Sequence, residues 1–531
     1  MSNYRYRPKK GKKKSAFHQM RQHILDRIPD SYADLYPTAR SMKRHFIIHS
    51  GGTNSGKTYE SLKALEAAQR GIYLGPLRLL AFECFERLNA AGVPTSLITG
   101  EEEKLIPGSF HQASTIEMMD EEEIHDVGVI DEAQMIAETQ RGGRWTAAIL
   151  GLPAREIHVC TAPYALPIII RLIEYCNDSY EVVEHERKIP LVVQRKEFLF
   201  PANVEDKDAL VVFSKKSVLA VASELQARGV KTSVIYGALP YEVRQQEMNR
   251  FLQGETQVVA ATDAIGMGLN LPVKRIVFLE SKKYDGRTSR ALLPEEIQQI
   301  AGRAGRYGIY NKGYVSSSYN RKWIRASLNV SIPKIEVAIL PFPESLIDLE
   351  GKLSSIMERW NEIPESGFFV KGDIRREIRL CKELEEYTDD KDLIYAFITI
   401  PYNEENQVLR AIWLEMFMDE IEGTVTSYEE EYSHIPRPLA ANLPDLEFIY
   451  EKCDLIYFFC RSFHHEDCMP NLEEARSQIC RNIIKILSEQ KLPGKRCKNC
   501  GKELPWNYPY GVCEECFVNK RYRYNDYGYR W

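Results

Sequence analysis

Residues 51–58 read GGTNSGKT, which fits the pattern G-x-x-x-x-G-K-[ST]. An apolar run at Phe46–His49 precedes this segment and an amphipathic pattern at Thr58–Gln69 follows it, so we expect it to join a strand to a helix. Glycines let successive backbone N–H groups curl around phosphates, and the helix N-terminus adds partial positive charge. The segment predicts a nucleoside triphosphate site formed by Gly52, Thr53, Asn54, Ser55, Gly56, Lys57 and Thr58, with Lys57 at the β- and γ-phosphates.

Two adjacent acids end a second apolar run, in VGVIDEAQM at residues 127–135. At the carboxyl end of a strand, Asp131 could hold Mg²⁺ together with the Thr58 hydroxyl, and Glu132 could orient and deprotonate the attacking water. Adjacent acids at a strand end can also form an ordinary turn. The phosphate-binding pattern upstream favours the catalytic interpretation.

A third segment, QQIAGRAGR at residues 298–306, contains Gln299, Arg303 and Arg306. Two arginines three residues apart would lie on one face of a helix. Facing a γ-phosphate from a second lobe, they would stabilise the charge of the transition state. The alternative is a helix with two surface arginines, but that alternative leaves the small residues around both arginines unexplained.

Four cysteines near the carboxyl end have metal-ligand spacing, C-x₂-C-x₁₂-C-x₂-C. Thiolates arranged in this way hold Zn²⁺ tetrahedrally and leave no position for a substrate, so the predicted site is structural. The alternative is four unrelated buried cysteines. The predicted ligands are Cys497, Cys500, Cys513 and Cys516.

The charge is uneven along the 531 residues, whose formal net charge is -5. Residues 1–14 carry seven Lys or Arg and no acid, and residues 491–531 carry nine basic residues against four acids. In the last segment, 519–531, arginines alternate with tyrosines, a composition suited to stacking on unpaired bases and pairing with phosphates. Two basic ends on an acidic body indicate a polyanionic partner, although solvated or disordered ends would have the same composition.

From residue 45 to about residue 330, short apolar runs alternate with amphipathic stretches, which is typical of parallel sheets covered by helices. A charged connection at residues 180–208 divides this region into two similar lobes, and helical patterns such as Ser345–Trp360 dominate after residue 333. The predicted fold class is α/β, with two parallel-sheet lobes, a helical region and a small zinc-binding module. The predicted divisions are a basic extension (1–44), lobe 1 (45–183), lobe 2 (184–332), a helical accessory domain (333–490), the zinc module (491–518) and a basic aromatic tail (519–531).

Several segments together resemble one family, the Suv-three RNA helicases of superfamily two, which have two RecA-like lobes. The segments, which occur in one order, are GGTNSGKTYES, LGPLRLLAFE, LITGEEE, STIEMM, DEAQM, VVFSKKSV, VIYGALP, ATDAIGMGLN and QIAGRAGR. The resemblance implies an ATP-dependent RNA helicase that uses ATP and Mg²⁺, moves from 3′ to 5′ on single strands and unwinds duplexes. It also implies a role in RNA turnover, with an exoribonuclease as a partner.

The resemblance also assigns further site residues. Gly268 and Asn270 would approach the nucleotide, and Thr161 and Ala162 occupy a motif that couples hydrolysis to strand movement. The residues implied to contact the phosphodiester chain of single-stranded or partly duplex RNA are Pro76, Leu77, Arg78, Thr99, Gly100, Thr115 and Thr262.

Other functions remain open on the sequence alone: a DNA helicase, a translocase that does not unwind, or a nucleic-acid-binding scaffold with an inactive nucleotide site. Intact Lys57, Asp131, Glu132, Arg303 and Arg306 argue against the scaffold. No apolar run approaches the ~18 residues of a membrane-spanning helix, so no membrane partner is expected. Twelve cysteines are too few for a disulfide scaffold, and we therefore expect a reducing, cytoplasmic location.

Overall fold

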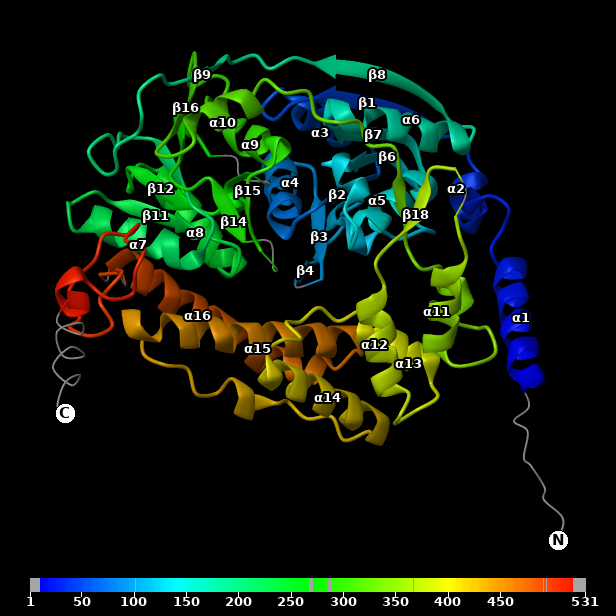
Figure 1. Cartoon of the computed structure of the whole chain (residues 1–531). Helices are drawn as coiled ribbons and strands as arrows, with labels where there is room; N and C mark the ends of the chain where they lie inside the picture. The colour runs from blue at the N-terminus through cyan, green and yellow to red at the C-terminus, as the bar shows by residue number, and fades with distance from the viewer. Residues whose placement is uncertain are drawn as a thin grey trace, which may run out of the picture.

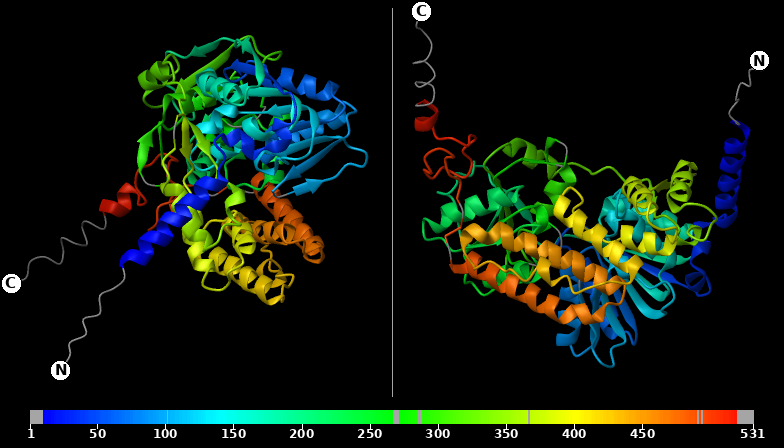
Figure 2. Two further views of the ribbon diagram at one scale, coloured as in Figure 1. Left: turned by 90° about the vertical axis from the view of Figure 1, so that its right-hand side faces the viewer. Right: turned by 90° about the horizontal axis from the view of Figure 1, so that it is seen from below.

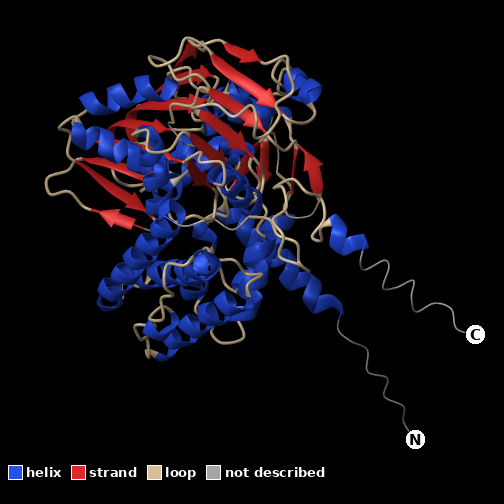
Figure 3. Ribbon diagram, turned by 90° about the vertical axis from the view of Figure 1, so that its left-hand side faces the viewer, coloured by secondary structure: helices blue, strands red, loops and turns tan. Residues whose placement is uncertain are grey.

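The computed structural model describes residues 10–518 except 101, 267–270, 285, 287, 366, 490 and 493. Two α/β lobes lie side by side, and a region of helices lies beneath both of them (Figure 1). Seen from the side, helices lie against the strands of the α/β part (Figure 3). The predicted α/β fold class with two parallel-sheet, RecA-like lobes and a following helical region is confirmed.

The sheet of lobe 1 has eight strands in the order β4-β3-β5-β2-β6-β7-β1-β8, parallel except for the β3–β4 pair. Its central strands are buried apolar runs, as expected for a parallel sheet covered on both faces. The strands are β1 (His45–Gly51), β2 (Gly71–Gly75), β3 (Thr95–Thr99), β4 (Glu102–Lys104), β5 (His111–Thr115), β6 (His125–Ile130), β7 (Ala154–Thr161) and β8 (Ser179–His185). The helices are α3 (Lys57–Ala67), α4 (Arg78–Ala90), α5 (Gly142–Gly151) and α6 (Leu166–Tyr175).

The sheet of lobe 2 has six parallel strands in the order β11-β12-β10-β13-β16-β9. They are β9 (Leu191–Val193), β10 (Asp208–Val211), β11 (Thr232–Ile235), β12 (Val258–Ala261), β13 (Arg275–Phe278) and β16 (Gly313–Ser317). The helices are α7 (Lys215–Gln226), α8 (Tyr241–Leu252), α9 (Pro294–Ala301) and α10 (Arg321–Ser327), and β14 (Lys282–Tyr284) pairs with β15 (Ser289–Ala291).

The connection expected to be irregular at residues 180–208 contains two strands. β8 pairs with β1 at the edge of the first sheet, and β9 pairs with β16 at the edge of the second. Edge strands such as β8, whose side chains are mostly exposed, need no apolar run, and for this reason the hydrophobicity pattern missed them. The chain between these two strands therefore passes directly from one lobe to the other.

The helical region is packed against the lobes. Its buried residues, such as Trp360, Trp413 and Phe459, belong to one hydrophobic core with Leu210 and Val234 of lobe 2. The expected helix at Ser345–Trp360 is shorter, because only residues 353–362 form it. The elements are β17 (Ala338–Leu340), α11 (Leu353–Glu362), β18 (Phe369–Lys371), α12 (Arg375–Leu384), α13 (Lys391–Ile398), α14 (Gln407–Glu422), α15 (Leu443–Ser462) and α16 (Met469–Glu489).

At the amino-terminal end, α1 (Lys10–Arg27) and the short α2 (Pro37–Arg40) precede the first strand. Figure 2 shows α1 projecting from the body, although its Ile24 is fully buried. Arg40 and Arg44 both bind the Asp178 carboxylate, at 3.1 and 2.5 Å, so this segment is anchored to lobe 1. Residues 1–9 and the predicted aromatic tail at 519–531 lie outside the described residues.

Candidate functional site between the two lobes

The glycine-rich segment forms the expected turn between β1 and α3. Gly56 precedes the helix, and Lys57 and Thr58 form its first turn. Lys57 is buried, and its ammonium donates to the carbonyls of Gly51 and Gly52 at 3.2 and 3.4 Å. The lysine is thus folded back onto its own loop, and a phosphate would compete with these carbonyls for its protons.

The two acids of the second motif lie beside this loop. Asp131 is buried, and it accepts from the Thr58 hydroxyl at 3.3 Å and from Tyr73 at 3.0 Å. Burial, followed by the Glu132 charge, raises the pKa of Asp131 to about 6. A divalent cation held by the Thr58 and Asp131 oxygens would offset the buried negative charge, so these groups fit Mg²⁺.

Glu132 adopts a left-handed backbone conformation with φ of 50°, directly after the strand. The Gln134 side chain bridges two motifs, because its amide nitrogen donates to the Glu132 carboxylate and its oxygen accepts from the Ala162 N–H at 3.2 Å. The contact links the expected water-activating acid to the segment expected to couple hydrolysis to strand movement. Tyr73 and Gln134 were not among the predicted site residues, although Gln134 belongs to the DEAQ segment.

Lobe 2 contributes the third motif at the end of α9. The helix ends at Ala301, so Arg303 and Arg306 lie in the turn after it and the prediction that they share a helix was wrong. Beyond Ala301 the N–H groups of Arg303 and Ala304 bond to the third residue back, and Gly305 then adopts φ of 77°, which turns the chain before Arg306. Arg303 donates to the Gly266 carbonyl at 2.7 and 3.0 Å, and Gln299, Arg303 and Arg306 are all half-buried.

The two motifs meet across the lobe interface. The Asn54 amide of the glycine-rich loop donates to the Gly302 carbonyl at 2.9 Å. Arg187, in the connection between the lobes, donates to the carbonyls of Thr53 at 3.1 Å, Gly302 at 2.6 Å and Ala304. Burial lowers the pKa of Arg187, which is half-buried and has no carboxylate among these partners. A lone arginine in a charged connection gives no sequence signal for this bridging position.

The residues expected to contact RNA in lobe 1 follow three adjacent strands. Pro76, Leu77 and Arg78 come after β2, Thr99 ends β3 and Gly100 follows it, and Thr115 ends β5. Because neighbouring parallel strands end at one edge of a sheet, the structure brings this set together. Thr262, expected to act from lobe 2, follows β12 and is buried.

Helix α15 covers part of that edge. The Phe458 ring lies against Gly100, and the Arg461 guanidinium donates to the Thr99 carbonyl. Arg78 pairs with Glu102 at 2.7 Å and with Glu242 of lobe 2 at 3.2 Å. In this conformation Arg78 therefore faces carboxylates and not an open surface.

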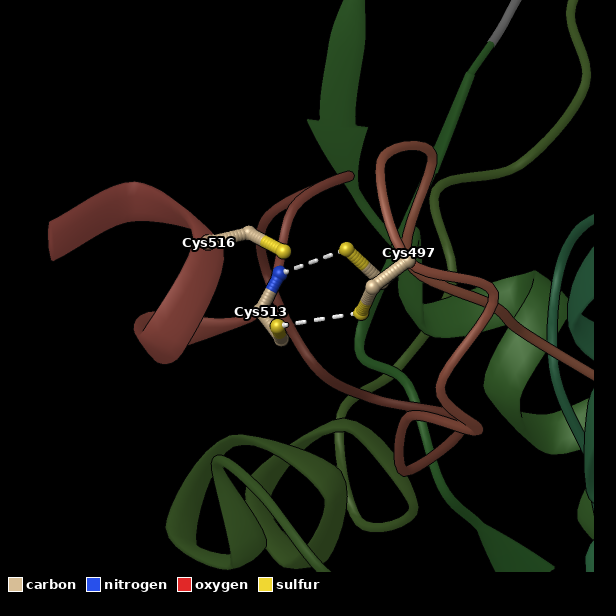
Figure 4. A group of neighbouring side chains, drawn as sticks. Cys497, Cys513 and Cys516 are labelled. Atoms are coloured by element: carbon tan, nitrogen blue, oxygen red, sulfur yellow. Dashed lines mark hydrogen bonds between the residues drawn. The ribbon is translucent and has the colours of Figure 1, made fainter. Parts of the chain in front are cut away.

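The four cysteines of the predicted metal site come together. Their sulfur atoms all lie within 4.8 Å of one another, and the Cys500 and Cys513 sulfurs are 3.6 Å apart. Figure 4 shows the sulfurs of Cys497, Cys513 and Cys516 converging from a loop and a helical turn. The Cys513 N–H donates to the Cys497 sulfur at 3.2 Å, and this bond is the main cause that lowers the pKa of the Cys497 thiol to about 6. Tetrahedral thiolates at ~2.3 Å from zinc are ~3.8 Å apart, so the cluster fits such an ion.

A row of histidines, which the sequence interpretation did not single out, lies beside the glycine-rich loop on strands β7, β1 and β8. The His49 Nδ1 is 2.9 Å from the His185 Nε2, and the His49 Nε2 is 2.9 Å from the His158 Nδ1. Burial, followed by the neighbouring histidines, lowers the pKa of His49 to about 4, and burial also lowers the pKa of His185. His49 is therefore neutral near pH 7.

Together, a glycine-rich loop with buried lysine and acid in one RecA-like lobe, and an arginine motif in the next, define a two-lobed nucleotide-dependent motor. Residues 32–185 match the DEXQ-box helicase domain of Suv3, and residues 193–308 match the helicase conserved C-terminal domain. The chain is 36% identical over 482 residues to the mitochondrial DExH-box ATP-dependent RNA helicase DExH16 of Arabidopsis thaliana, covering 87% of this chain and 83% of that protein.

Two further relatives agree. The chain is 35% identical over 477 residues to the mitochondrial ATP-dependent RNA helicase SUV3 of Oryza sativa, covering 86% of this chain and 81% of that protein. It is 32% identical over 480 residues to the human mitochondrial ATP-dependent RNA helicase SUPV3L1, covering 84% and 59%. The chain belongs to the Suv3 family of ATP-dependent RNA helicases, as the sequence motifs predicted.

The prediction of the cellular location is contradicted. These relatives are named as mitochondrial proteins, so the expected cytoplasmic location was wrong. Sparse cysteines indicate a reducing compartment but do not separate one such compartment from another. Within the described part of the chain, no helix is long and apolar enough to cross a bilayer. Gly268 and Asn270 fall outside the described residues, and their expected role at the nucleotide stays a prediction.

Proposed function

We propose that ATP binds between the lobes, with the loop of residues 52–58 around its phosphates and the arginines of lobe 2 closing the site. The single observation that carries this proposal is the contact between the glycine-rich loop and the turn after α9, made by Asn54 and Arg187. That contact sets the Gly302 carbonyl, next to Arg303, against the loop that also contains Lys57, which supports a nucleotide site shared by the two lobes.

Each group then has a role that its chemistry supports. Lys57 exchanges its loop carbonyls for phosphate oxygens, and Thr58 and Asp131 hold Mg²⁺, which neutralises phosphate charge when bound. Glu132 orients the attacking water and accepts its proton. Arg303 and Arg306 stabilise charge on the transferred phosphoryl group, and Gln299 completes the site from α9. Gln134, which contacts both the Glu132 carboxylate and the Ala162 N–H, couples a change in the position or protonation of Glu132 to the backbone at Ala162.

We propose that RNA crosses the carboxyl edges of β2, β3 and β5, where Pro76, Leu77, Thr99, Gly100 and Thr115 meet its phosphates, and continues past Thr262. Arg78 joins this set when its two carboxylate partners release it. Such contacts position a strand without reading its sequence, so binding is sequence-tolerant and falls steeply with salt. Alternate opening and closing of the cleft moves the strand, and the family resemblance supports movement from 3′ to 5′.

The test compares single-stranded RNA and DNA of equal length as activators of ATP hydrolysis, followed by unwinding of duplexes with a 3′ or a 5′ overhang. We expect stronger stimulation by RNA and unwinding only from a 3′ overhang. Equal stimulation by DNA would favour a DNA helicase, and stimulation without strand separation would favour a translocase. A protein that binds RNA without any hydrolysis would be a scaffold.

We also propose that one structural zinc ion is bound by Cys497, Cys500, Cys513 and Cys516. We further propose that the segment from residue 491 onward binds RNA. Thiolate ligands and basic neighbours such as Lys495 and Lys498 support both parts. Deleting residues 491–531 is expected to weaken RNA affinity more than basal ATP hydrolysis. A deletion that lowers hydrolysis and leaves RNA affinity intact would contradict this proposal.

The resemblance further supports a role in RNA turnover with an exoribonuclease as partner. Unwinding would supply single strands to such an enzyme. Measuring degradation of a duplex by a 3′-to-5′ exoribonuclease with and without this protein and ATP tests the role. Degradation that is unchanged by ATP would contradict it.

A further inference from the structure

Three histidines on adjacent strands form a hydrogen-bonded row next to the glycine-rich loop. His158, His49 and His185 lie on β7, β1 and β8, which are neighbours in the first sheet (Figure 1). His185 directly opposes Gly51 in the β1–β8 register, and a Cβ atom on Gly51 would lie 2.6 Å from the His185 carbonyl oxygen. Only glycine permits this close approach, so His185 packs directly against the base of the loop.

A carboxylate lies beside the row. The Glu60 Oε2 is 3.8 Å from the His185 Nε2, and ligand atoms of His49, His185 and Glu60 all lie within 4.8 Å of one another. Glu60 follows Lys57 by one helical turn on α3. The His185 side chain is 6% exposed and the Glu60 side chain is 52% exposed, so the group is open to solvent on the glutamate side only.

The far end of the row fixes the orientation of His49. The His158 Nε2 is 2.9 Å from the Glu156 carboxylate, which makes that nitrogen the donor and leaves the His158 Nδ1 as an acceptor. The His49 Nε2 then carries its proton toward His158, and the His49 Nδ1 keeps its lone pair on the side of His185 and Glu60. Partner groups that fix the tautomer of a histidine in this way typically accompany metal ligands.

We propose that His49, His185 and Glu60 bind a divalent transition-metal ion, of which zinc fits best, behind the glycine-rich loop. Two imidazoles and one carboxylate form a donor set that zinc uses, with a fourth position left for water. Tetrahedral nitrogens at ~2.0–2.1 Å from the metal are ~3.3 Å apart, so the two histidine nitrogens need to separate by ~0.4 Å and the rings need to turn until both lone pairs point at the ion. For the His185 Nε2 to bind, its proton must shift to the Nδ1 of the same ring, so that both facing nitrogens offer lone pairs and the imidazole stays neutral.

Such an ion would join three elements around the loop, namely β1, β8 and the first turn of α3. β8 leads directly to Arg187, which bonds the loop to the turn after α9. The ion would therefore restrict the motion of the glycine-rich loop and of the first residues of the inter-lobe connection, which follow β8. This site is distinct from the cysteine cluster and from the oxygens of Thr58 and Asp131.

The experiment measures zinc per full-length chain after chelation, reconstitution with stoichiometric zinc in excess Mg²⁺, and gel filtration. We expect two ions in the unaltered protein, one in His185→Gln, and one in a Cys500→Ser/Cys513→Ser variant. Cobalt substitution separates the two sites, because thiolate ligands produce intense charge-transfer absorption and the histidine site does not. His45→Gln, on the same strand β1 but outside the row, is the matched control and should retain both ions.

A loss of zinc in His185→Gln could also come from misfolding. Glu60→Gln tests for this, because the Glu60 side chain is half exposed and is not part of the nucleotide site. In the cysteine variant background it is expected to weaken zinc affinity at least tenfold and to abolish the rise in Tm that zinc produces. One ion in the unaltered protein, lost entirely in the cysteine variant, would overturn the proposal and leave the row as a hydrogen-bonded network. Unchanged zinc affinity in Glu60→Gln would remove the glutamate as a ligand and overturn the three-ligand site.

Discussion

The two halves of the nucleotide site differ in how completely they are formed. In lobe 1, Lys57 and Asp131 are buried, and they form hydrogen bonds of 3.0–3.3 Å with Gly51, Thr58 and Tyr73. In lobe 2, Gln299 and Arg306 are half-buried, and Arg303 is bonded to a carbonyl of its own lobe. The halves differ in burial, because the lobe 1 groups are enclosed and the lobe 2 groups are partly exposed. In both halves a basic side chain bonded to carbonyls of its own lobe must exchange them for phosphate oxygens.

The largest effect should come from the lobe 2 arginines. Arg306→Ala is expected to lower kcat for ATP hydrolysis by ~10³-fold or more with little loss of ATP binding, because an arginine finger acts on the transition state. Steady-state hydrolysis and binding of a fluorescent ATP analogue measure the two quantities. Arg325→Ala, exposed on α10 in the same lobe, is the control. If ATP binding falls as much as kcat, Arg306 contributes to binding of the nucleotide itself, and the two lobes do not differ in the step that they serve.

Glu132→Gln tests the catalytic step within lobe 1. We expect kcat to fall by ~10²–10⁴-fold because the amide cannot accept the proton from water, while nucleotide binding persists. The same assays apply. Turnover at the unaltered rate would remove Glu132 from the catalytic role and leave its contact with Gln134 as a structural one.

Arg187→Ala tests the link between the halves. Losing charge-assisted bonds to Thr53, Gly302 and Ala304 is expected to lower RNA-stimulated hydrolysis about tenfold, which corresponds to ~1.4 kcal/mol. Arg187→Lys should not restore the rate, because one ammonium cannot reproduce a planar fork. Arg195→Ala, exposed in the same connection, serves as the control. A reduction of the RNA-independent rate alone would contradict the coupling role.

The smallest effect concerns pH. The pKa of Asp131 is raised to about 6, so the carboxylate is protonated below that pH and loses its attraction for Mg²⁺. The Mg²⁺ concentration needed for half-maximal nucleotide binding is expected to rise about fourfold from pH ~7.5 to ~5.5. In Glu132→Gln the rise should begin at lower pH, because the Glu132 charge contributes to the raised pKa. A Mg²⁺ requirement independent of pH would contradict this account.

The raised pKa also has a consequence for stability. Because the folded pKa exceeds the ordinary value of 3.8, ionisation of this buried group destabilises the fold as pH rises through about 6. Asp131→Asn is therefore expected to raise the Tm of the Mg²⁺-free protein at neutral pH while abolishing hydrolysis. A lower Tm would mean that hydrogen bonds and nearby positive charge stabilise the Asp131 carboxylate by more than its burial costs.

The sequence by itself determined the fold class and the family. The loop at residues 52–58, the acids at 131 and 132 and the four cysteines are local patterns, and each lies where its flanking strand, helix or turn predicted it. Strands such as β1, β6 and β13 were predicted because burial on both faces requires an unbroken apolar run. The arginine turn after α9 was only partly predicted, because a glycine that ends a helix and a glycine within one look alike in sequence.

Only the tertiary structure decided which distant residues meet. The histidine row is an example, because His49 lies more than a hundred residues before His158 and His185 in the sequence. The three become neighbours because β7 and β8 both pair with β1. Arg187 reaches Thr53 and Gly302 because β8 and β9 end the two sheets on either side of it, and edge strands have no periodic signal. Hydrophobic periodicity is set by the few residues around each position, whereas strand order and lobe contact are set by the packing of whole surfaces.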